Sequence, residues 1–275
     1  MRVFIGAILF LSLFVVAQAN AKQKVIYGDD DRLDLYDVKN SLHVDLSKST
    51  AAMVPPRNLK KLSNGNYQVL SKTLEDEGLC SDEKFADQPV TAACSGFLVG
   101  DDLLVTAGHC IESATDCSHY KWVFDYAYED ASHNNLDEIE GSNVYSCEKI
   151  IERKLDSGIG ADYALIQLST KVADRGPLEF RKSGKVADGR PLVVMGHPTG
   201  LPLKVADGAI VRSNVNPKYF IANLDTFGGN SGSAVFDADS GLVEGILVRG
   251  EQDYEWDSAS KCVRPKQCKD TGCRG

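Results

Sequence analysis

Short apolar runs separated by turn residues fill most of the chain after about residue 68. One run at 97–99 is followed by Gly100-Asp101-Asp102, and the next occupies 103–105. Further runs of strand length lie at 122–124, 163–168, 192–194, 209–211, 219–221, 234–236 and 242–248. Most are rich in branched or aromatic side chains, and helical periodicity is nearly absent. The pattern predicts an all-β barrel or sandwich.

The first 21 residues follow a different pattern. A short cationic start, Met1-Arg2, precedes an apolar run over 3–17, and small residues at Ala19 and Ala21 follow. The run is shorter than the roughly 20 residues that a membrane-spanning helix needs. This pattern favours a secretory signal peptide, cleaved after residue 21, over a membrane anchor.

Residues 22–67 form a polar stretch, rich in Asp, Lys and Ser, with a weak apolar pattern. It is compatible with a propeptide, an arm packed on the body or a loose tail, and the sequence does not choose among them. We therefore divide the chain into a signal peptide (1–21), an N-terminal extension or propeptide (22–67) and a main domain (68–275).

Composition narrows the function classes. The 275 residues are 43% hydrophobic, which is too apolar for a disordered chain. Asp plus Glu outnumber Lys plus Arg by 39 to 30, for a net charge of −9, so the chain is a poor candidate for binding nucleic acid. Eight cysteines favour an oxidising compartment. We expect a secreted protein, extracellular or periplasmic and not bound to a membrane after signal cleavage.

A serine surrounded by glycines is the strongest chemical motif, in Gly228-Gly229-Asn230-Ser231-Gly232-Ser233. The motif lies between two strand-like runs. Glycines permit the tight turn that a nucleophilic serine requires. In such a turn the N–H groups of Gly229 and Ser231 can stabilise a developing oxyanion.

His109 follows the apolar run 103–105 in Thr106-Ala107-Gly108-His109-Cys110. Serine needs a neighbouring base, and histidine is the usual one because its pKa lies near neutrality. The other four histidines lie in polar or turn-like settings, and we assign them no function: His43, His119, His133 and His197.

Asp162 opens the apolar run Tyr163-Ala164-Leu165-Ile166-Gln167-Leu168. A carboxylate at the head of such a strand is poorly placed unless it accepts a hydrogen bond. An imidazole N–H would satisfy it, and the carboxylate would then fix the tautomer of the histidine.

With TAGHC, DYALIQL and GGNSGSAVF in this order, the chain resembles the trypsin-fold serine peptidases over 68–250. Within them it is most similar to the secreted bacterial glutamyl-endopeptidase-like branch. The resemblance implies two perpendicular six-stranded antiparallel β-barrels, at about 68–172 and 185–250, with the active site in the cleft between them. A cysteine-rich tail follows at 251–275.

The resemblance also implies roles. Ser231 would attack the peptide bond, His109 would move the proton and Asp162 would orient His109. Substrates would be proteins or peptides, no cofactor would be needed, and the default oligomeric state is a monomer.

For the cysteines, the resemblance implies a Cys94–Cys110 bridge that closes the histidine loop. Cys117 and Cys147 flank an acidic loop, and we pair them on that ground. The remaining four cysteines, Cys80, Cys262, Cys268 and Cys273, would then form two further bridges among themselves, in an order left open. A zinc site among these cysteines and a calcium site in the acidic loop are disfavoured, so we expect no metal.

The residue before the nucleophile is Asn230, where the trypsin branch has an aspartate that receives the new N-terminus on activation. This switch should be absent. In the specificity pocket, Asp225 at the base would favour Arg or Lys before the cleaved bond, whereas Thr226 is a feature of glutamate-specific relatives. Val248 and Gly250 would contact the peptide backbone.

Two alternatives stay open. A peptidase homologue without activity could bind a partner through the same cleft. If the interpretation of the pocket is wrong, the enzyme would be a glutamate-specific endopeptidase.

Overall fold

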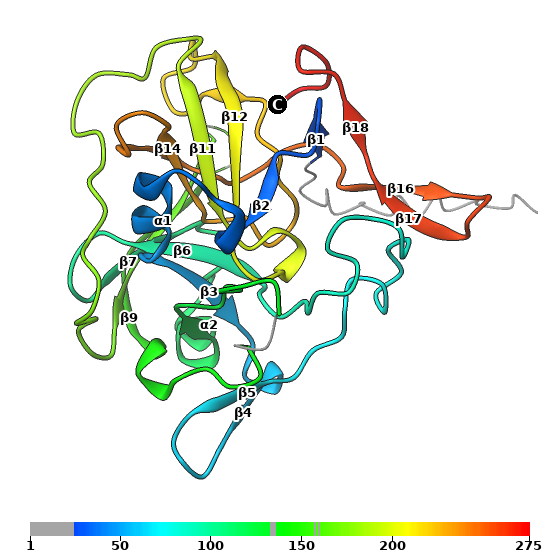
Figure 1. The fold of residues 1–275 in the computed structure, drawn as a ribbon. Coiled ribbons are helices and arrows are strands. Elements are labelled where there is room, and N and C mark those ends of the chain that lie inside the picture. Colours follow the sequence, from blue (N-terminus) through cyan, green and yellow to red (C-terminus); the bar gives the residue numbers. More distant parts are fainter. Residues whose placement is uncertain (1–24, 133–135, 157, 159) are drawn as a thin grey trace, which may run out of the picture.

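Six antiparallel strands close into a barrel around the first hydrophobic core (Figure 1). In order around the barrel they are β10 (Ala161–Leu168), β7 (Leu103–Thr106), β6 (Cys94–Leu98), β3 (Thr50–Val54), β8 (Lys121–Val123) and β9 (Val144–Asp156). The interior is filled by fully buried side chains that include Leu98, Leu104, Trp122, Phe124 and Ile166. The computed structural model describes residues 25–132, 136–156, 158 and 160–275.

A second six-stranded antiparallel sheet carries the other half of the molecule. Its order is β13 (Ile221–Ala222), β12 (Lys204–Ser213), β11 (Pro191–Gly196), β14 (Ala234–Asp237) and β15 (Val243–Ile246), and β2 (Arg32–Asp34) also pairs with β12. This sheet has its own core, which includes Leu192, Val194, Val211 and Val235. The predicted double-barrel fold is confirmed.

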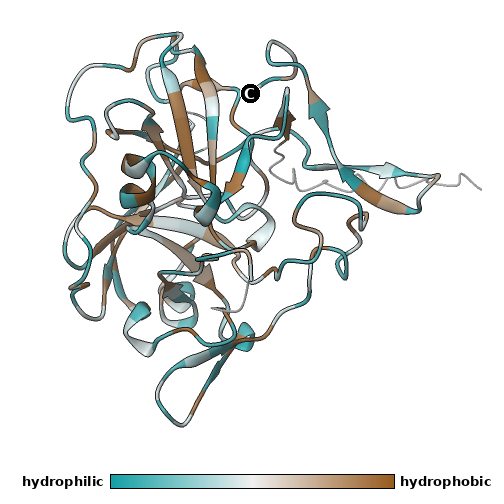
Figure 2. Ribbon diagram, viewed as in Figure 1, coloured by the Kyte–Doolittle hydropathy of each residue, from teal (hydrophilic) through white to brown (hydrophobic). Residues whose placement is uncertain are grey.

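The two halves pack through a third apolar cluster. Successive side chains of a strand point to opposite faces, so Leu192 and Val194 of β11 enter the second core while Val193 and Met195 point the other way. There they meet Phe97 from β6 of the first barrel. Figure 2 shows hydrophobic residues gathered on these central strands. A strand buried on both faces shows no alternation, which is why the sequence displays continuous apolar runs.

Residues 25–67 belong to the folded body, which differs from the predicted boundary at residue 68. β3 is a strand of the first barrel, and β2 is a strand of the second sheet. The sequence Thr50-Ala51-Ala52-Met53-Val54 is buried at every position, so it lacks the alternation of a half-exposed strand. Its small alanines also make the apolar run inconspicuous.

Shorter elements complete the fold. They are the helices α1 (Ser41–Ser47) and α2 (Ala114–His119), the 3₁₀ turns Leu35–Asp37, Pro56–Asn58, Gly141–Asn143 and Pro198–Gly200, the hairpin β4 (Leu59–Lys61) with β5 (Tyr67–Val69), and the hairpin β16 (Tyr254–Asp257) with β17 (Cys262–Pro265). In the C-terminal tail, β18 (Gln267–Cys268) runs parallel to β1 (Ile26–Tyr27). The tail therefore holds the start of the described chain.

Four disulfides join the eight cysteines: Cys80–Cys262, Cys94–Cys110, Cys117–Cys147 and Cys268–Cys273. The second and third are the pairs that the sequence analysis named. The first and fourth give the order that it left open.

Among the described residues, no helix has the length and apolar character needed to cross a membrane. The predicted signal peptide, residues 1–21, lies outside the described residues.

Asp34→Asn should destabilise the protein by about 3–5 kcal/mol. Lys204 and Asp34 are both buried, with Lys204 Nζ 2.6 Å from Asp34 Oδ1, and Gln88 donates to the other carboxylate oxygen. The substitution leaves a buried ammonium without its counter-charge. Urea denaturation measures the effect. The matched control, Asp45→Asn, removes an exposed ion pair with Lys48 and should change stability by about 0.5 kcal/mol or less.

Candidate active site

His109 lies just beyond the end of β7, where the backbone passes close to β9 and β10. A Cβ atom on Gly108 would lie 2.3 Å from the Lys154 carbonyl oxygen and 2.8 Å from that of Tyr163, so only glycine fits. The Cys94–Cys110 disulfide then ties the residue after His109 back to β6. Strand end, glycine and disulfide together fix the position of the imidazole.

Asp162, at the start of β10, holds His109 through both carboxylate oxygens. Oδ2 lies 2.8 Å from His109 Nδ1, and Oδ1 accepts the His109 backbone N–H at 3.0 Å. The aspartate side chain is 8% exposed and the histidine side chain 18%. A carboxylate in this position places the proton on Nδ1, which leaves Nε2 of the neutral ring as a base.

Ser231 is buried on a loop between β13 and β14 that is attached to the first barrel. The backbone N–H of Ser95, on β6, donates to the Ser231 carbonyl oxygen at 2.8 Å. Ser95 Oγ donates to the Gly229 carbonyl oxygen at 2.9 Å and accepts the His197 N–H at 3.0 Å. The Sγ atom of Cys110, the neighbour of His109, lies 3.6 Å from the Ser231 carbonyl oxygen. The structure thus brings the predicted serine and histidine segments together.

The glycines of this loop are required by close contacts. Gly229 has φ 88° and Gly232 has φ 91°, a region that favours glycine. A Cβ atom on Gly229 would lie 2.4 Å from the His197 carbonyl oxygen, and one on Gly232 would lie 2.1 Å from the Ser95 carbonyl oxygen.

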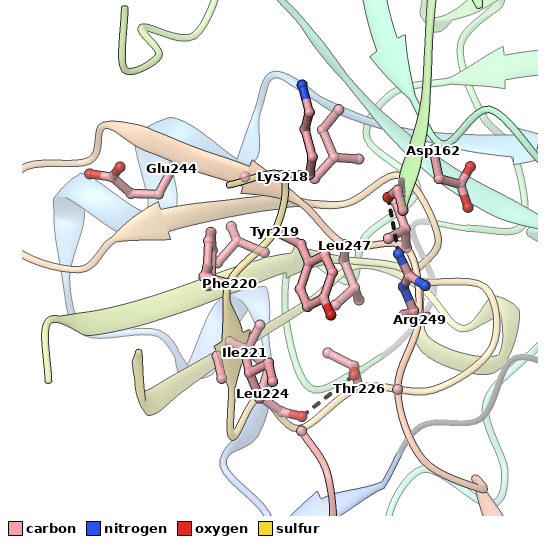
Figure 3. A pocket seen from close by; sticks show the side chains of 18 of the residues that line it. Asp162, Lys218, Tyr219, Phe220, Ile221, Leu224, Thr226, Glu244, Leu247 and Arg249 are labelled. Carbon is pink, nitrogen blue, oxygen red and sulfur yellow. Dashed lines mark hydrogen bonds between the residues drawn. The ribbon is translucent and has the colours of Figure 1, made fainter. Parts of the chain in front are cut away.

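A cavity of about 1020 Å³ opens beside Asp162 and is lined by both halves of the molecule (Figure 3). Thr226, Val248 and Gly250, which the sequence analysis placed in the substrate pocket, line it. Buried side chains form its floor, namely Val25, Tyr27, Leu224, Thr226, Val235 and Leu247.

Asp225 is absent from the lining of this cavity, although the sequence analysis placed it at the pocket base. Its carboxylate accepts the backbone N–H of Tyr27 at 2.7 Å and that of Asp31 at 2.9 Å. Burial raises the pKa of Asp225 to about 7. The carboxylate is used to dock the N-terminal segment, which the sequence analysis had left outside the domain.

Two contributors to the site were missed by sequence reasoning. Ser95 directly follows Cys94, and the sequence analysis assigned it no role. Val25, whose carbonyl oxygen accepts the Thr226 N–H at 3.2 Å, gave no apolar pattern. Both act through contacts between segments far apart in the chain.

No described histidine lines the cavity, His109 included, and the lining reaches the histidine–aspartate pair through Asp162. His197 is buried, its Nδ1 lies 3.1 Å from the Leu201 carbonyl oxygen, and burial lowers its pKa to about 3, so it stays neutral. His43 is also buried, and His119 lies on α2. His133 lies outside the described residues.

One group of potential metal ligands lies close together in the described part of the chain: Cys94, His109 and Cys110. Both sulfur atoms belong to the disulfide, so neither provides a thiolate for a metal ion.

The two β-sheet halves of the molecule meet where the Asp162–His109 pair and the glycine-flanked Ser231 lie. This arrangement is typical of a serine-type peptidase. The family model described as "Trypsin-like peptidase domain" matches residues 94–246, more than half of the chain. The chain belongs to this family.

Solved structures agree on the fold. The structure of "Glu endopeptidase in complex with MPD" is similar with a TM-score of 0.50 and 18% identity, covering 88% of this chain and 93% of that one. The Vibrio cholerae VesB protease is similar with a TM-score of 0.51 and 15% identity, covering 87% of this chain and 63% of that one. A search of curated proteins gave no match.

Asp225→Asn should remove a decrease in the free energy of unfolding that the parent protein shows as the pH rises. Because burial raises the pKa of Asp225 from 3.8 to about 7, the folded protein keeps a proton that the unfolded chain has released. The contribution of this group to the free energy of unfolding therefore falls as pH rises from about 4 to about 7. Urea denaturation across this range should show the parent protein losing stability relative to the variant. A difference that does not change with pH would contradict the assignment.

Proposed function

We propose that this serine peptidase is a secreted endopeptidase that cleaves proteins or peptides through an acyl-enzyme, with His109, Asp162 and Ser231 as its catalytic residues. The observation that carries the proposal is the contact of both Asp162 oxygens with His109. A carboxylate held in this way orients the ring and stabilises the imidazolium that forms during the reaction.

In this mechanism His109 Nε2 takes the proton of Ser231 Oγ as the oxygen attacks the scissile carbonyl. The same nitrogen then donates the proton to the leaving amine, and water later hydrolyses the ester by the reverse sequence. The N–H groups of Gly229 and Ser231 stabilise the oxyanion, for which the positive φ of Gly229 provides the turn. No step needs a cofactor or a metal ion.

Asn230 supports a site that needs no N-terminal ion pair. Its side chain is buried, its Oδ1 lies 3.2 Å from Ser233 Oγ, and its backbone N–H donates to the Phe227 carbonyl oxygen at 3.1 Å. A neutral amide with local partners gives a new N-terminus no charge to pair with. Activation by the trypsin route is therefore not part of the proposal.

The four disulfides support export to an oxidising compartment. Cleavage of residues 1–21, a monomeric state and the absence of a nucleic-acid partner are retained from the sequence. The preference for Arg or Lys before the cleaved bond stays a prediction, and Asp225 no longer supports it because its carboxylate binds the N-terminal segment. A digest of a peptide library tests it, and cleavage mainly after Glu would favour the glutamate-specific alternative.

Ser231→Ala should abolish covalent labelling by a fluorophosphonate probe and leave the circular dichroism spectrum unchanged. Mass spectrometry of the secreted protein reads the labelled residue and the mature N-terminus together. Label on Ser231 supports the proposal. Folded parent protein that never labels would favour the alternative in which the chain is a binding protein without activity.

Asp162→Asn should lower kcat by about 10⁴-fold while KM changes little, because the amide no longer fixes the tautomer of His109. Steady-state kinetics on a peptide that the parent enzyme cleaves measure both constants. A loss smaller than about 10-fold would show that Asp162 does not orient the catalytic base.

A further inference from the structure

The rim of the 1020 Å³ cavity differs in chemistry from its buried floor. Four cationic side chains line the cavity: Lys154, Lys218, Arg249 and Arg274. All four residues are exposed, whereas the floor residues are buried. They come from both halves of the molecule, since Lys154 lies on β9 and Lys218 precedes β13. The cations therefore border the cavity from both halves of the molecule.

These cations have no carboxylate partner in the described part of the chain. No acidic group lies within ion-pair distance of Lys154, Lys218, Arg249 or Arg274 among residues 25–132, 136–156, 158 and 160–275. An acidic protein with a net charge of −9 has an excess of carboxylates with which to neutralise exposed cations. At the cavity, however, the four cationic side chains have no carboxylate partner among the described residues.

The carboxylates that line the cavity are mostly engaged elsewhere. Glu244 forms a two-bond ion pair with Arg181. Glu251 lies 3.7 Å from Lys266 Nζ and accepts the backbone N–H of Arg274 at 2.9 Å, which does not involve the Arg274 guanidinium. Asp162 holds His109. Glu152 accepts a hydrogen bond from the Tyr163 hydroxyl at 2.5 Å. It is the lining carboxylate that has no cationic partner among the described residues. The balance of charge at the rim is therefore positive.

Arg249 is held in place at this rim. Its Nη2 donates to the Gly160 carbonyl oxygen at 3.0 Å, and its guanidinium lies 5.2 Å from the centroid of the Tyr219 ring. Figure 3 shows it between Tyr219 and the strand that carries Asp162. The carbonyl that Nη2 binds is neutral, so it does not compensate the charge of the Arg249 guanidinium. The other N–H groups of the guanidinium remain available for a ligand.

We propose that this cationic rim selects acidic side chains in the substrate residues that precede the cleaved bond, with Arg249 as the principal determinant. The inference rests on the proposed endopeptidase function and adds a substrate class to it. Arg249 lies between Val248 and Gly250, the positions expected to contact the peptide backbone, so its side chain borders the residues before the bond. A planar guanidinium suits a carboxylate because it can donate two parallel hydrogen bonds.

The test compares matched peptides that differ only two to four residues before the cleaved bond, with Gln, Glu or Lys there. For the parent enzyme at low salt we expect kcat/KM to be about 5-fold higher for Glu than for Gln, and lower for Lys than for Gln. In 0.5 M NaCl the Glu preference should shrink, because salt screens exposed charges. In Arg249→Gln the Glu-to-Gln ratio should fall to about 1–2.

Two variants serve as controls. Arg249→Lys keeps the charge and loses the planar donor pair, so it should retain part of the preference. Lys60→Gln removes an exposed cation on β4, outside the cavity, and should leave the ratio as in the parent enzyme. Equal kcat/KM for Glu and Gln peptides in the active parent enzyme would overturn the proposal and leave the endopeptidase function standing.

Failure of the enzymatic function would be visible separately. If no peptide is cleaved, fluorescence anisotropy with labelled Glu and Gln peptides still measures binding to the cavity. Tighter binding of the Glu peptide, lost in Arg249→Gln, would support the cationic rim in a binding protein. Equal binding would overturn it.

Discussion

The attachment of the Ser231 loop to β6 is the contact on which the proposed active site depends. Ser231 lies on the second half of the molecule and His109 on the first, so neither half contains the site alone. Ser95 joins them, since its N–H and Oγ bind the carbonyl oxygens of Ser231 and Gly229. The approach is so close that Gly232 has no room for a side chain. The position of Ser231, the proposed nucleophile, thus depends on the packing between the two halves.

A second constraint comes from the N-terminal segment, which supports the wall of the cavity. Val25 and Tyr27 bind Thr226 and Asp225 through the backbone, and the guanidinium of Arg32 lies 4.3 Å from the centroid of the Phe227 ring. The parallel pairing of β1 with β18 joins this segment to the C-terminal tail. Segments from both ends of the described chain therefore stabilise the residues just before Ser231. This is the reason that Asp225 serves the fold and not the pocket.

Charge is distributed unevenly over the molecule. The chain is acidic overall, yet the exposed lining of the cavity carries unneutralised cations. In the proposed function, an acidic substrate would meet repulsion from the acidic surface and attraction at the rim, and salt would screen both because the charges are exposed. The proposal thus assigns to the rim the discrimination between substrates that have reached the cavity.

The sequence by itself indicated the all-β class and the segments that carry His109, Asp162 and Ser231, whereas the double barrel was implied by the resemblance of these motifs to a known family. Apolar runs between turns and short motifs are local features, so each can be recognised from a single segment of the chain. Tertiary structure alone decided the place of Thr50–Val54 in the first barrel, the partners of Asp225 and the cations that share the cavity with Arg249. A strand buried on both faces does not alternate between apolar and polar residues, so its sequence does not reveal it. The partner of a side chain depends on which distant segment folding brings to it.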